Sequence, residues 1–217
     1  MLTTVTRESR YGATEAKIFV MQSRNEKLQR FIAATEDAIR VRAADSAEAM
    51  PMVERIFAAL QKPGKANSKP SPSRLPVCRH LEAAYHQARS GPGPIPKMAE
   101  AFAAIEPAFS WDRRQSTVQA TGEFYDGHAN AYIVGKGGLE SRSDVLIGVS
   151  LVAPGVLYPR HRHPPEELYI VLSPGEWMQN DNPMTPRQSG DLVHNPPNVW
   201  HGMRADKAPL LAVWCLC

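Results

Sequence analysis

The pattern of apolar residues changes near Trp111, and this change constrains the fold of the chain more than any other feature. Before Trp111, apolar residues recur at mixed three- and four-residue steps among Ala, Glu, Arg and Gln, as they do on amphipathic helices. After it, short runs rich in β-branched and aromatic residues alternate with Gly, Asp, Asn and Pro, as in antiparallel barrels and sandwiches. The sequence therefore predicts a helical region over residues 1–110 and an all-β region over residues 111–217.

The helical region is divided by its turn-forming residues. The periodicity from Glu15 to Leu60 predicts two or three helices, with a break at Asp45-Ser46, and Ser46 can open the next helix. Pro51 would then lie in the first turns of that helix, where proline is tolerated. A surface loop rich in Pro, Ser, Gly and Lys is expected over residues 62–76, followed by two shorter helices over residues 77–89 and 96–105.

In the β-region, four segments have the composition of strands: residues 131–134, 145–152, 168–172 and 210–216. The last of these leads into two of the three cysteines of the chain, Cys215 and Cys217. Side chains two positions apart on a strand face the same way, so a disulfide between these two cysteines is not expected. The cysteines are interpreted as ordinary thiols.

Charge and length exclude several classes of protein. The chain has 217 residues, enough to bury a core, and its net charge of +3 comes without the clustered basic face of a nucleic-acid-binding protein. No segment reaches the roughly 20 apolar residues needed to cross a bilayer, and the charged residues within Met1–Val20 do not fit a secretory signal. We therefore expect a cytoplasmic protein with neither a nucleic-acid nor a membrane partner. Its helices could cap the β-region, cover an edge strand or form a homodimer interface.

The densest chemistry lies between Tyr158 and Tyr169 (YPRHRHPPEELY) and is followed by a further histidine, His201. On an extended strand alternate side chains share a face, provided that the Pro-Pro turn preserves this parity. Four odd-numbered residues then lie together: His161, His163, Glu167 and Tyr169. Glu166 would point away, and the two glutamates would exchange roles if the turn shifted the parity. Imidazole and carboxylate ligands suit Zn, Fe, Mn, Ni or Cu, and the lack of thiolates argues against a closed structural zinc site.

These residues resemble the two motifs of the cupin family. The first motif is matched by Gly155, His161, His163 and Glu167, with Gly175 one residue late. The second is matched by Gly190, Pro196 and His201, while Asn198 replaces a glycine and Ala205 replaces an asparagine. Asparagine tolerates the left-handed backbone that glycine serves in such turns. The resemblance covers residues 145–217 and implies a mainly β fold, a C-terminal cupin (an antiparallel β-barrel or jelly roll) preceded by an α-helical N-terminal region.

Two tyrosines narrow the resemblance within the cupins. Tyr158 lies three residues before His161, and Tyr169 lies two residues after Glu167. This set is similar to the cupin-type dimethylsulfoniopropionate lyases of the DddL and DddQ kind, which also carry a helical region ahead of the barrel. The resemblance implies cleavage of dimethylsulfoniopropionate to acrylate and dimethyl sulfide by β-elimination.

The same resemblance implies a role for each residue of the motif. His163, Glu167 and His201 would hold one divalent transition metal: Zn, Fe, Mn or Ni. Tyr169 would lie at or beside the metal, as a ligand and as the general base. Tyr158 and His161 would belong to the surrounding catalytic site, and either could serve as the base in place of Tyr169.

The sulfonium group of such a substrate requires an aromatic wall, because the faces of aromatic rings attract cations. The candidates are Tyr158, Trp200, Trp214, Trp177 and Tyr125, although each tryptophan could instead pack in the core. Histidines outside the motif are expected to be surface or structural residues: His80, His86, His128 and His194.

Three other functions fit the same motifs. A cupin without metal could serve as a small-molecule-binding module, although the principal ligands are present. A different metal-dependent cupin enzyme, a dioxygenase or an isomerase, would use Fe or Mn in the same pocket. A sensing cupin with a DNA-binding head is disfavoured, because the helical region lacks a compact basic recognition helix.

Overall fold

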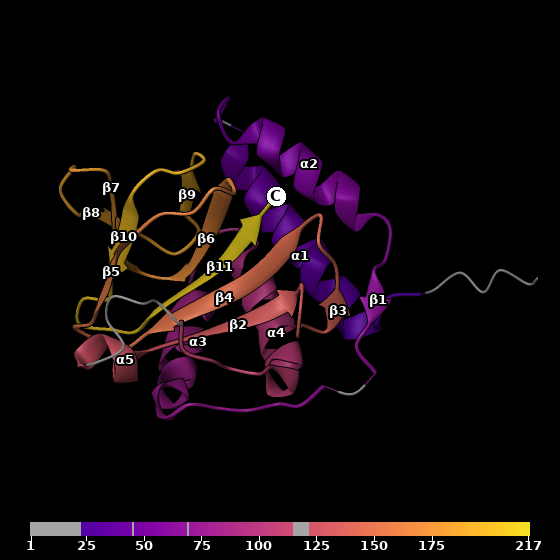
Figure 1. The fold of residues 1–217 in the computed structure, drawn as a ribbon, viewed down its shortest axis with the longest axis horizontal. Coiled ribbons are helices and arrows are strands. Elements are labelled where there is room, and N and C mark those ends of the chain that lie inside the picture. The colour runs from indigo at the N-terminus through magenta and orange to yellow at the C-terminus, as the bar shows by residue number, and fades with distance from the viewer. Residues whose placement is uncertain (1–22, 45, 69, 115–121) are drawn as a thin grey trace, which may run out of the picture.

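A computed structural model describes residues 23–44, 46–68, 70–114 and 122–217. Two β-sheets form the centre of the molecule, and four helices cover one face of the larger sheet (Figure 1). The four longer helices lie before residue 110 and ten of the eleven described strands lie after it, mostly in antiparallel pairs, which confirms the predicted fold class. Whether residues 1–110 and 111–217 are separate domains stays a prediction.

The helices follow the predicted periodicity. They are α1 (Glu26–Ala43), α2 (Met50–Leu60), α3 (Leu81–Arg89), α4 (Ile95–Ile105) and the short α5 (Glu123–Gly127), with single 3-10 turns at Pro76–His80 and Glu106–Ala108. The part of the predicted helical stretch from Glu15 to Gln22 lies outside the described residues. Helix α5 was missed because its five residues are too few to show a helical period.

Local signals explain where the first two helices begin. The side chain of Asn25 accepts hydrogen bonds from the backbone of Lys27 and Leu28 at 3.0 and 3.2 Å, and so caps α1. Ser46 Oγ accepts from the backbone N–H of Ala49 at 3.3 Å in the turn before α2. Pro51 lies in the first turn of α2, as predicted.

The larger sheet has seven strands in the order β1-β3-β2-β4-β11-β6-β9, and the smaller sheet has four in the order β5-β10-β7-β8. The strands of the larger sheet are β1 (Lys65–Ala66), β3 (Glu140–Ser141), β2 (His128–Val134), β4 (Leu146–Val152), β11 (Leu210–Leu216), β6 (Glu167–Ser173) and β9 (Leu192–Asn195). Those of the smaller sheet are β5 (Leu157–His161), β10 (His201–Arg204), β7 (Gly175–Gln179) and β8 (Thr185–Arg187).

All four predicted strands are present, as β2, β4, β6 and β11. The predicted loop over residues 62–76 also contains β1, which pairs with β3 at the edge of the larger sheet. Two residues carry too little pattern to be recognised as a strand from sequence, and only the partner strand makes them one.

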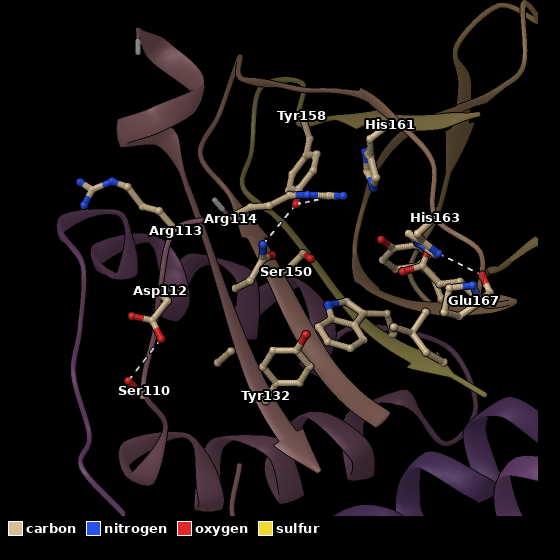
Figure 2. Close-up of a pocket in the computed structure, with 16 residues that line it drawn as sticks. Ser110, Asp112, Arg113, Arg114, Tyr132, Ser150, Tyr158, His161, His163 and Glu167 are labelled. Atoms are coloured by element: carbon tan, nitrogen blue, oxygen red, sulfur yellow. Dashed lines mark hydrogen bonds and ion pairs between the residues drawn. The ribbon is translucent and has the colours of Figure 1, made fainter. Parts of the chain in front are cut away.

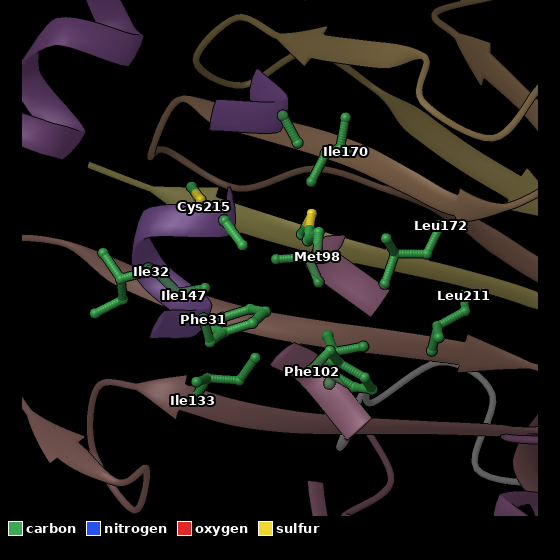
Figure 3. Packing of buried hydrophobic residues seen from close by; sticks show 14 of the residues in the cluster. Phe31, Ile32, Met98, Phe102, Ile133, Ile147, Ile170, Leu172, Leu211 and Cys215 are labelled. Carbon is green, nitrogen blue, oxygen red and sulfur yellow. The ribbon is translucent and has the colours of Figure 1, made fainter. Parts of the chain in front are cut away.

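Alternation along the central strands separates two cores. On β11, Leu211 and Cys215 face the helices, whereas Ala212 and Trp214 face the smaller sheet. The helix-facing core joins Phe31 of α1 and Met98 and Phe102 of α4 to the large sheet (Figure 3). The other core lies between the two sheets, and it contains Tyr158 and Tyr169 of the motif.

Two further expectations concern thiols and membranes. Cys78, Cys215 and Cys217 are free thiols, so the expected absence of a bridge between the last two is confirmed. Among the described helices, none combines the length and the apolar character that a bilayer span requires.

Candidate metal centre and active site

A cavity of about 410 Å³ opens between the inner face of the large sheet and β5. Its lining is drawn in Figure 2 and comes from segments that are far apart in the sequence. One wall carries His161, His163, Glu167 and Tyr169, and the opposite side carries residues of β2 and β4 together with the segment before residue 115. The cavity therefore gathers most of the motif that the sequence singled out.

Three histidines converge here: His161 and His163 line the cavity, and the buried His201 lies against them. One ring nitrogen each from His161, His163 and His201 lies within 4.8 Å of the other two. The pairing of β5 with β10 places His161 opposite His201 in register, and their ring centroids are 4.2 Å apart. His163 follows β5 directly, and its backbone carbonyl accepts a hydrogen bond from the N–H of Asn198 at 2.9 Å. The turn before β10 thus holds His163 close to His201.

Backbone contacts fix the tautomer that each of the three rings adopts when it is neutral. Nδ1 of His161, His163 and His201 lies 2.9, 3.0 and 3.0 Å from the carbonyls of Pro159, Pro165 and Val199, respectively. A carbonyl oxygen only accepts, so each Nδ1 carries a proton and donates it. Each Nε2 of a neutral ring then presents a lone pair, which is the arrangement of metal-binding histidines.

Glu167 completes the cluster at the start of β6. Its Oε2 lies 3.4 Å from His163 Nε2 and 3.1 Å from His201 Nε2. Burial would raise the pKa of this carboxyl, but the contacts with His163 and His201 outweigh it and lower the pKa. Asn195 Nδ2 donates to Glu167 Oε2 at 3.0 Å, and Asn195 is itself held by Gln179 at 2.7 Å. The carboxylate is therefore ionised and oriented.

The donor set fits a bound cation. A carboxylate oxygen and two ring nitrogens that all offer lone pairs lie close together, and only a proton or a metal ion between them can satisfy all three. Among the described residues, the buried Nε2 of His201 has no partner in hydrogen-bond geometry despite its closeness to Glu167. Nitrogen and oxygen ligands without thiolates suit a divalent transition metal. His161, which the sequence assigned to the surrounding site, stands within this group as a further possible ligand.

The two tyrosines lie on adjoining sides of the cavity and are both buried. The hydroxyl of Tyr158 accepts from Asn130 at 3.1 Å and from Arg114 at 3.4 Å. Burial raises the pKa of Tyr158. Burial and the adjacent charge of Glu167 also raise the pKa of Tyr169 well above its usual value, so its hydroxyl is protonated in the metal-free protein.

Of the aromatic candidates for a sulfonium wall, the structure brings Trp214 to the cavity but not Trp200. The Trp200 side chain is 36% exposed and lies against Arg160 and Arg162, 5.0 and 4.7 Å from its ring centre. Trp200 immediately precedes β10, whose first residue, His201, is buried, and the Trp200 ring turns to the outer side, toward the two arginines. The prediction that Trp200 lines the site is corrected accordingly.

The other aromatic candidates have structural neighbours. Trp177 is buried with its ring 6.3 Å from that of Tyr169, between the sheets. Tyr125 is partly exposed, with the guanidinium of Arg113 4.2 Å from its ring centre. Tyr132, which the sequence did not single out, lines the cavity and meets Trp214 edge to face at 5.3 Å.

Glu166 and the histidines outside the motif do not line the cavity, as the sequence predicted. Glu166 points away from the cluster and pairs with His194 at 2.7 Å and with Arg55. The parity of the Pro-Pro turn is therefore the one that places Glu167 inside. His128 is a buried structural residue whose ring stacks on Phe124 with centroids 3.9 Å apart. His80 and His86 lie on or beside α3, outside the cavity.

Sequence reasoning missed Arg114 and Asn130, which both line the cavity. Asn130 could have been found from the alternation of β2, because it shares a face with Tyr132. No local signal marks Arg114, since it lies outside any regular element and reaches the site through the fold.

Comparison with known proteins finds curated relatives that match parts of this sequence. The curated dimethylsulfoniopropionate lyase DddQ of Ruegeria pomeroyi is 28% identical over 121 residues, which cover 52% of this chain and 60% of the relative. The match thus spans less than two thirds of that relative. A gentisate 1,2-dioxygenase from a Ralstonia species is 31% identical over 64 residues, covering 29% of this chain and 18% of that protein.

Solved structures show the same fold. The crystal structure of DddQ from Ruegeria pomeroyi DSS-3 is similar with a TM-score of 0.68 and 22% identity, covering 88% of this chain and 90% of that chain. A chain from the crystal structures of the lyases RdDddP and RnDddQII gives a TM-score of 0.68 and 20% identity over 88% of this chain and 91% of that one. The family model described as dimethylsulfoniopropionate lyase matches residues 48–212, which include both the helices and the site. This chain belongs to the dimethylsulfoniopropionate lyase family.

Proposed function

We propose that this chain is a metal-dependent lyase that cleaves dimethylsulfoniopropionate to acrylate and dimethyl sulfide. The observation that carries the proposal is the convergence of three histidines, one ionised carboxylate and two buried tyrosines around one cavity in a chain of this family. A small zwitterion fits a cavity of about 410 Å³.

The metal ligands proposed are His163, His201 and Glu167, with His161 as a further donor. Zn, Fe, Mn and Ni all suit such a set. A divalent ion held here would act as a Lewis acid toward the substrate carboxylate and would favour the phenolate of Tyr169. Asn195 keeps the Glu167 carboxylate turned toward the histidines, which supports the assignment.

Tyr169 is the proposed general base. It would take the proton from the carbon next to the substrate carboxylate, while the bond between the other carbon and sulfur breaks. The electron pair of the C–H bond forms the double bond of acrylate, and the electron pair of the C–S bond leaves with dimethyl sulfide. The neighbouring position of Tyr169 and Glu167 on one face of β6 supports this role, because it keeps the hydroxyl beside the metal ligands.

Tyr158 is proposed to orient the substrate. Its oxygen already accepts hydrogen bonds from Asn130 and Arg114, so its own O–H is left to donate to a ligand in the cavity. The burial of both tyrosines limits the access of water to the reacting carbons.

The test is to supply dimethylsulfoniopropionate to purified protein that has been reconstituted separately with Zn, Mn, Fe or Ni, and to measure dimethyl sulfide by gas chromatography. Release is expected with at least one metal and should stop after chelation. His163→Ala and His201→Ala should lose both bound metal and activity, whereas His86→Ala, on α3 outside the cavity, should keep both. No release with any of the four metals would refute the proposal.

A dioxygenase is the second candidate, because 64 residues match a gentisate 1,2-dioxygenase. It predicts oxygen consumption with an aromatic diol and an Fe-loaded protein. An oxygen electrode run beside the gas-phase assay separates the two functions, since β-elimination consumes no oxygen.

A further inference from the structure

The guanidinium of Arg114 lies inside the cavity. In the proposed mechanism it serves only as a hydrogen-bond partner of Tyr158. Its Nη1 lies 3.4 Å from the Tyr158 hydroxyl, and its Cζ lies 5.8 Å from the centre of that ring. Figure 2 shows the guanidinium directed between Tyr158 and His161. Within the part of the chain that the structure describes, no carboxylate pairs with it.

The charge of Arg114 is not balanced by the carboxylate of the histidine wall. Glu167, the carboxylate at that wall, is engaged by His163 and His201 and leaves Arg114 uncompensated. A guanidinium without a carboxylate partner favours an anionic ligand, and its planar fork matches a carboxylate.

The backbone of Arg114 is held in place for such a task. Its N–H donates to Nε2 of His128 at 2.9 Å, while Nδ1 of His128 lies 2.5 Å from the carbonyl of Phe124. The ring of His128 is fixed by stacking on Phe124. Burial lowers the pKa of His128, so the ring stays neutral and keeps accepting from Arg114. This arrangement reduces the freedom that the side chain would lose on binding a ligand.

The side of the cavity that carries Tyr132 suits a cation. Tyr132 meets Trp214 edge to face in the lining, and Figure 2 shows the carboxylate of Asp112 on the same side as Tyr132. Tyr132 follows Asn130 by two residues on β2, and Asn130 contacts Tyr158 beside Arg114. Two residues on a strand span about 6.6 Å. The place beside Asn130, where Arg114 lies, is therefore separated from the aromatic ring of Tyr132 by a few bond lengths.

We propose that Arg114 pairs with the carboxylate of the substrate and thereby decides which end of a zwitterion faces the histidines. The sulfonium then lies against Tyr132 and Trp214. This inference rests on the proposed function for the identity of the substrate, but the recognition of a carboxylate by Arg114 can be tested without turnover.

The experiment compares propionate with propionamide, which have similar shapes but differ in charge, by NMR titration of the metal-loaded protein. In Arg114→Gln the preference for propionate should fall by about ten-fold or more, the effect of losing a charged hydrogen-bonded pair. Arg114→Lys, which keeps the charge but loses the fork, should show a partial loss and serves if the glutamine variant does not fold. In active protein, KM for dimethylsulfoniopropionate should rise more than kcat falls.

Arg160→Gln is the matched control. Arg160 precedes His161 on β5 and carries the same charge as Arg114, but it is not among the residues that line the cavity and pairs with the exposed Asp181 at 2.8 Å. Its removal should change the preference by less than about two-fold, because an exposed ion pair contributes little. Equal changes in both variants, or no change in Arg114→Gln, would overturn the inference. A wild-type protein that discriminates propionate through Arg114 but releases no dimethyl sulfide would refute only the proposed function.

Discussion

At the scale of single residues, the hydroxyl of Tyr169 is the group on which the proposed elimination depends. Replacing it in Tyr169→Phe should lower turnover by about a hundred- to ten-thousand-fold, the usual contribution of a positioned base. Metal content should persist, because the histidines and Glu167 remain. Dimethyl sulfide release and elemental analysis measure the two effects. Tyr85→Phe, in the helix-facing core, is the control and should stay active. Near-normal turnover in Tyr169→Phe would move the role of base to Tyr158 or His161.

Asn195 is expected to influence metal binding through its contact with Glu167. Asn195 is buried and donates to Glu167 while accepting from Gln179. In Asn195→Leu the carboxylate loses this donor, and metal affinity should fall by about ten- to a hundred-fold. Competition with a chromogenic chelator measures the affinity. Asn182→Leu, at an exposed turn, should leave it unchanged. An unaltered affinity in Asn195→Leu would mean that Glu167 is oriented by other contacts.

At the scale of elements, the pairing of β4 with β11 sets the position of an aromatic wall. Gly148 lies opposite Trp214 in register, and a Cβ at Gly148 would come within 2.1 Å of the indole ring. Gly148→Ala should therefore displace Trp214, raise KM and cost about 1–3 kcal/mol of unfolding free energy, as overpacking does. Urea denaturation and tryptophan fluorescence follow these changes. In a Trp214→Leu background the penalty should largely vanish, and an equal penalty in both backgrounds would contradict the steric explanation.

At the scale of the whole molecule, Glu140 ties the helices to the edge of the large sheet. It pairs with Arg24 before α1 at 2.6 Å, accepts from Gly64 N after α2 at 2.8 Å, and lies 3.5 Å from Arg142. Because Glu140 is 2% exposed, Glu140→Gln leaves buried positive charge and should cost about 3 kcal/mol of unfolding free energy. The exposed pair of Glu26 with Arg30 gives the control, and Glu26→Gln should have almost no effect.

The same network predicts a dependence on pH. Burial alone would raise the pKa of Glu140, but Arg24, the Gly64 N–H and Arg142 together lower it. The stabilisation is therefore complete above the usual carboxyl range and is lost as the pH falls through the lowered pKa of the folded state. Denaturation curves of the wild type and of Glu140→Gln should converge in acid. A constant difference across this range would exclude Glu140 as the titrating group.

The sequence by itself determined the elements and much of the metal wall. Periods of 3.6 and 2 residues show in neighbouring positions of the chain, so the four longer helices and the four longer strands followed from local pattern. The inward direction of Glu167 followed from the same alternation with the parity of the Pro-Pro turn preserved, as the structure has it. The left-handed backbone expected at Asn198 is present, with φ of 61°. These features depend on a few adjacent residues and on backbone sterics alone.

Only the tertiary structure decided which side chains meet. The register of β5 against β10 brought His161 to His201, and the Trp200 ring turned to the outer side. Arg114 entered the cavity from a segment without regular structure, held by His128 more than ten residues away. Such contacts arise from strand register and loop paths, which depend on the packing of distant segments, and no local period in the chain encodes them.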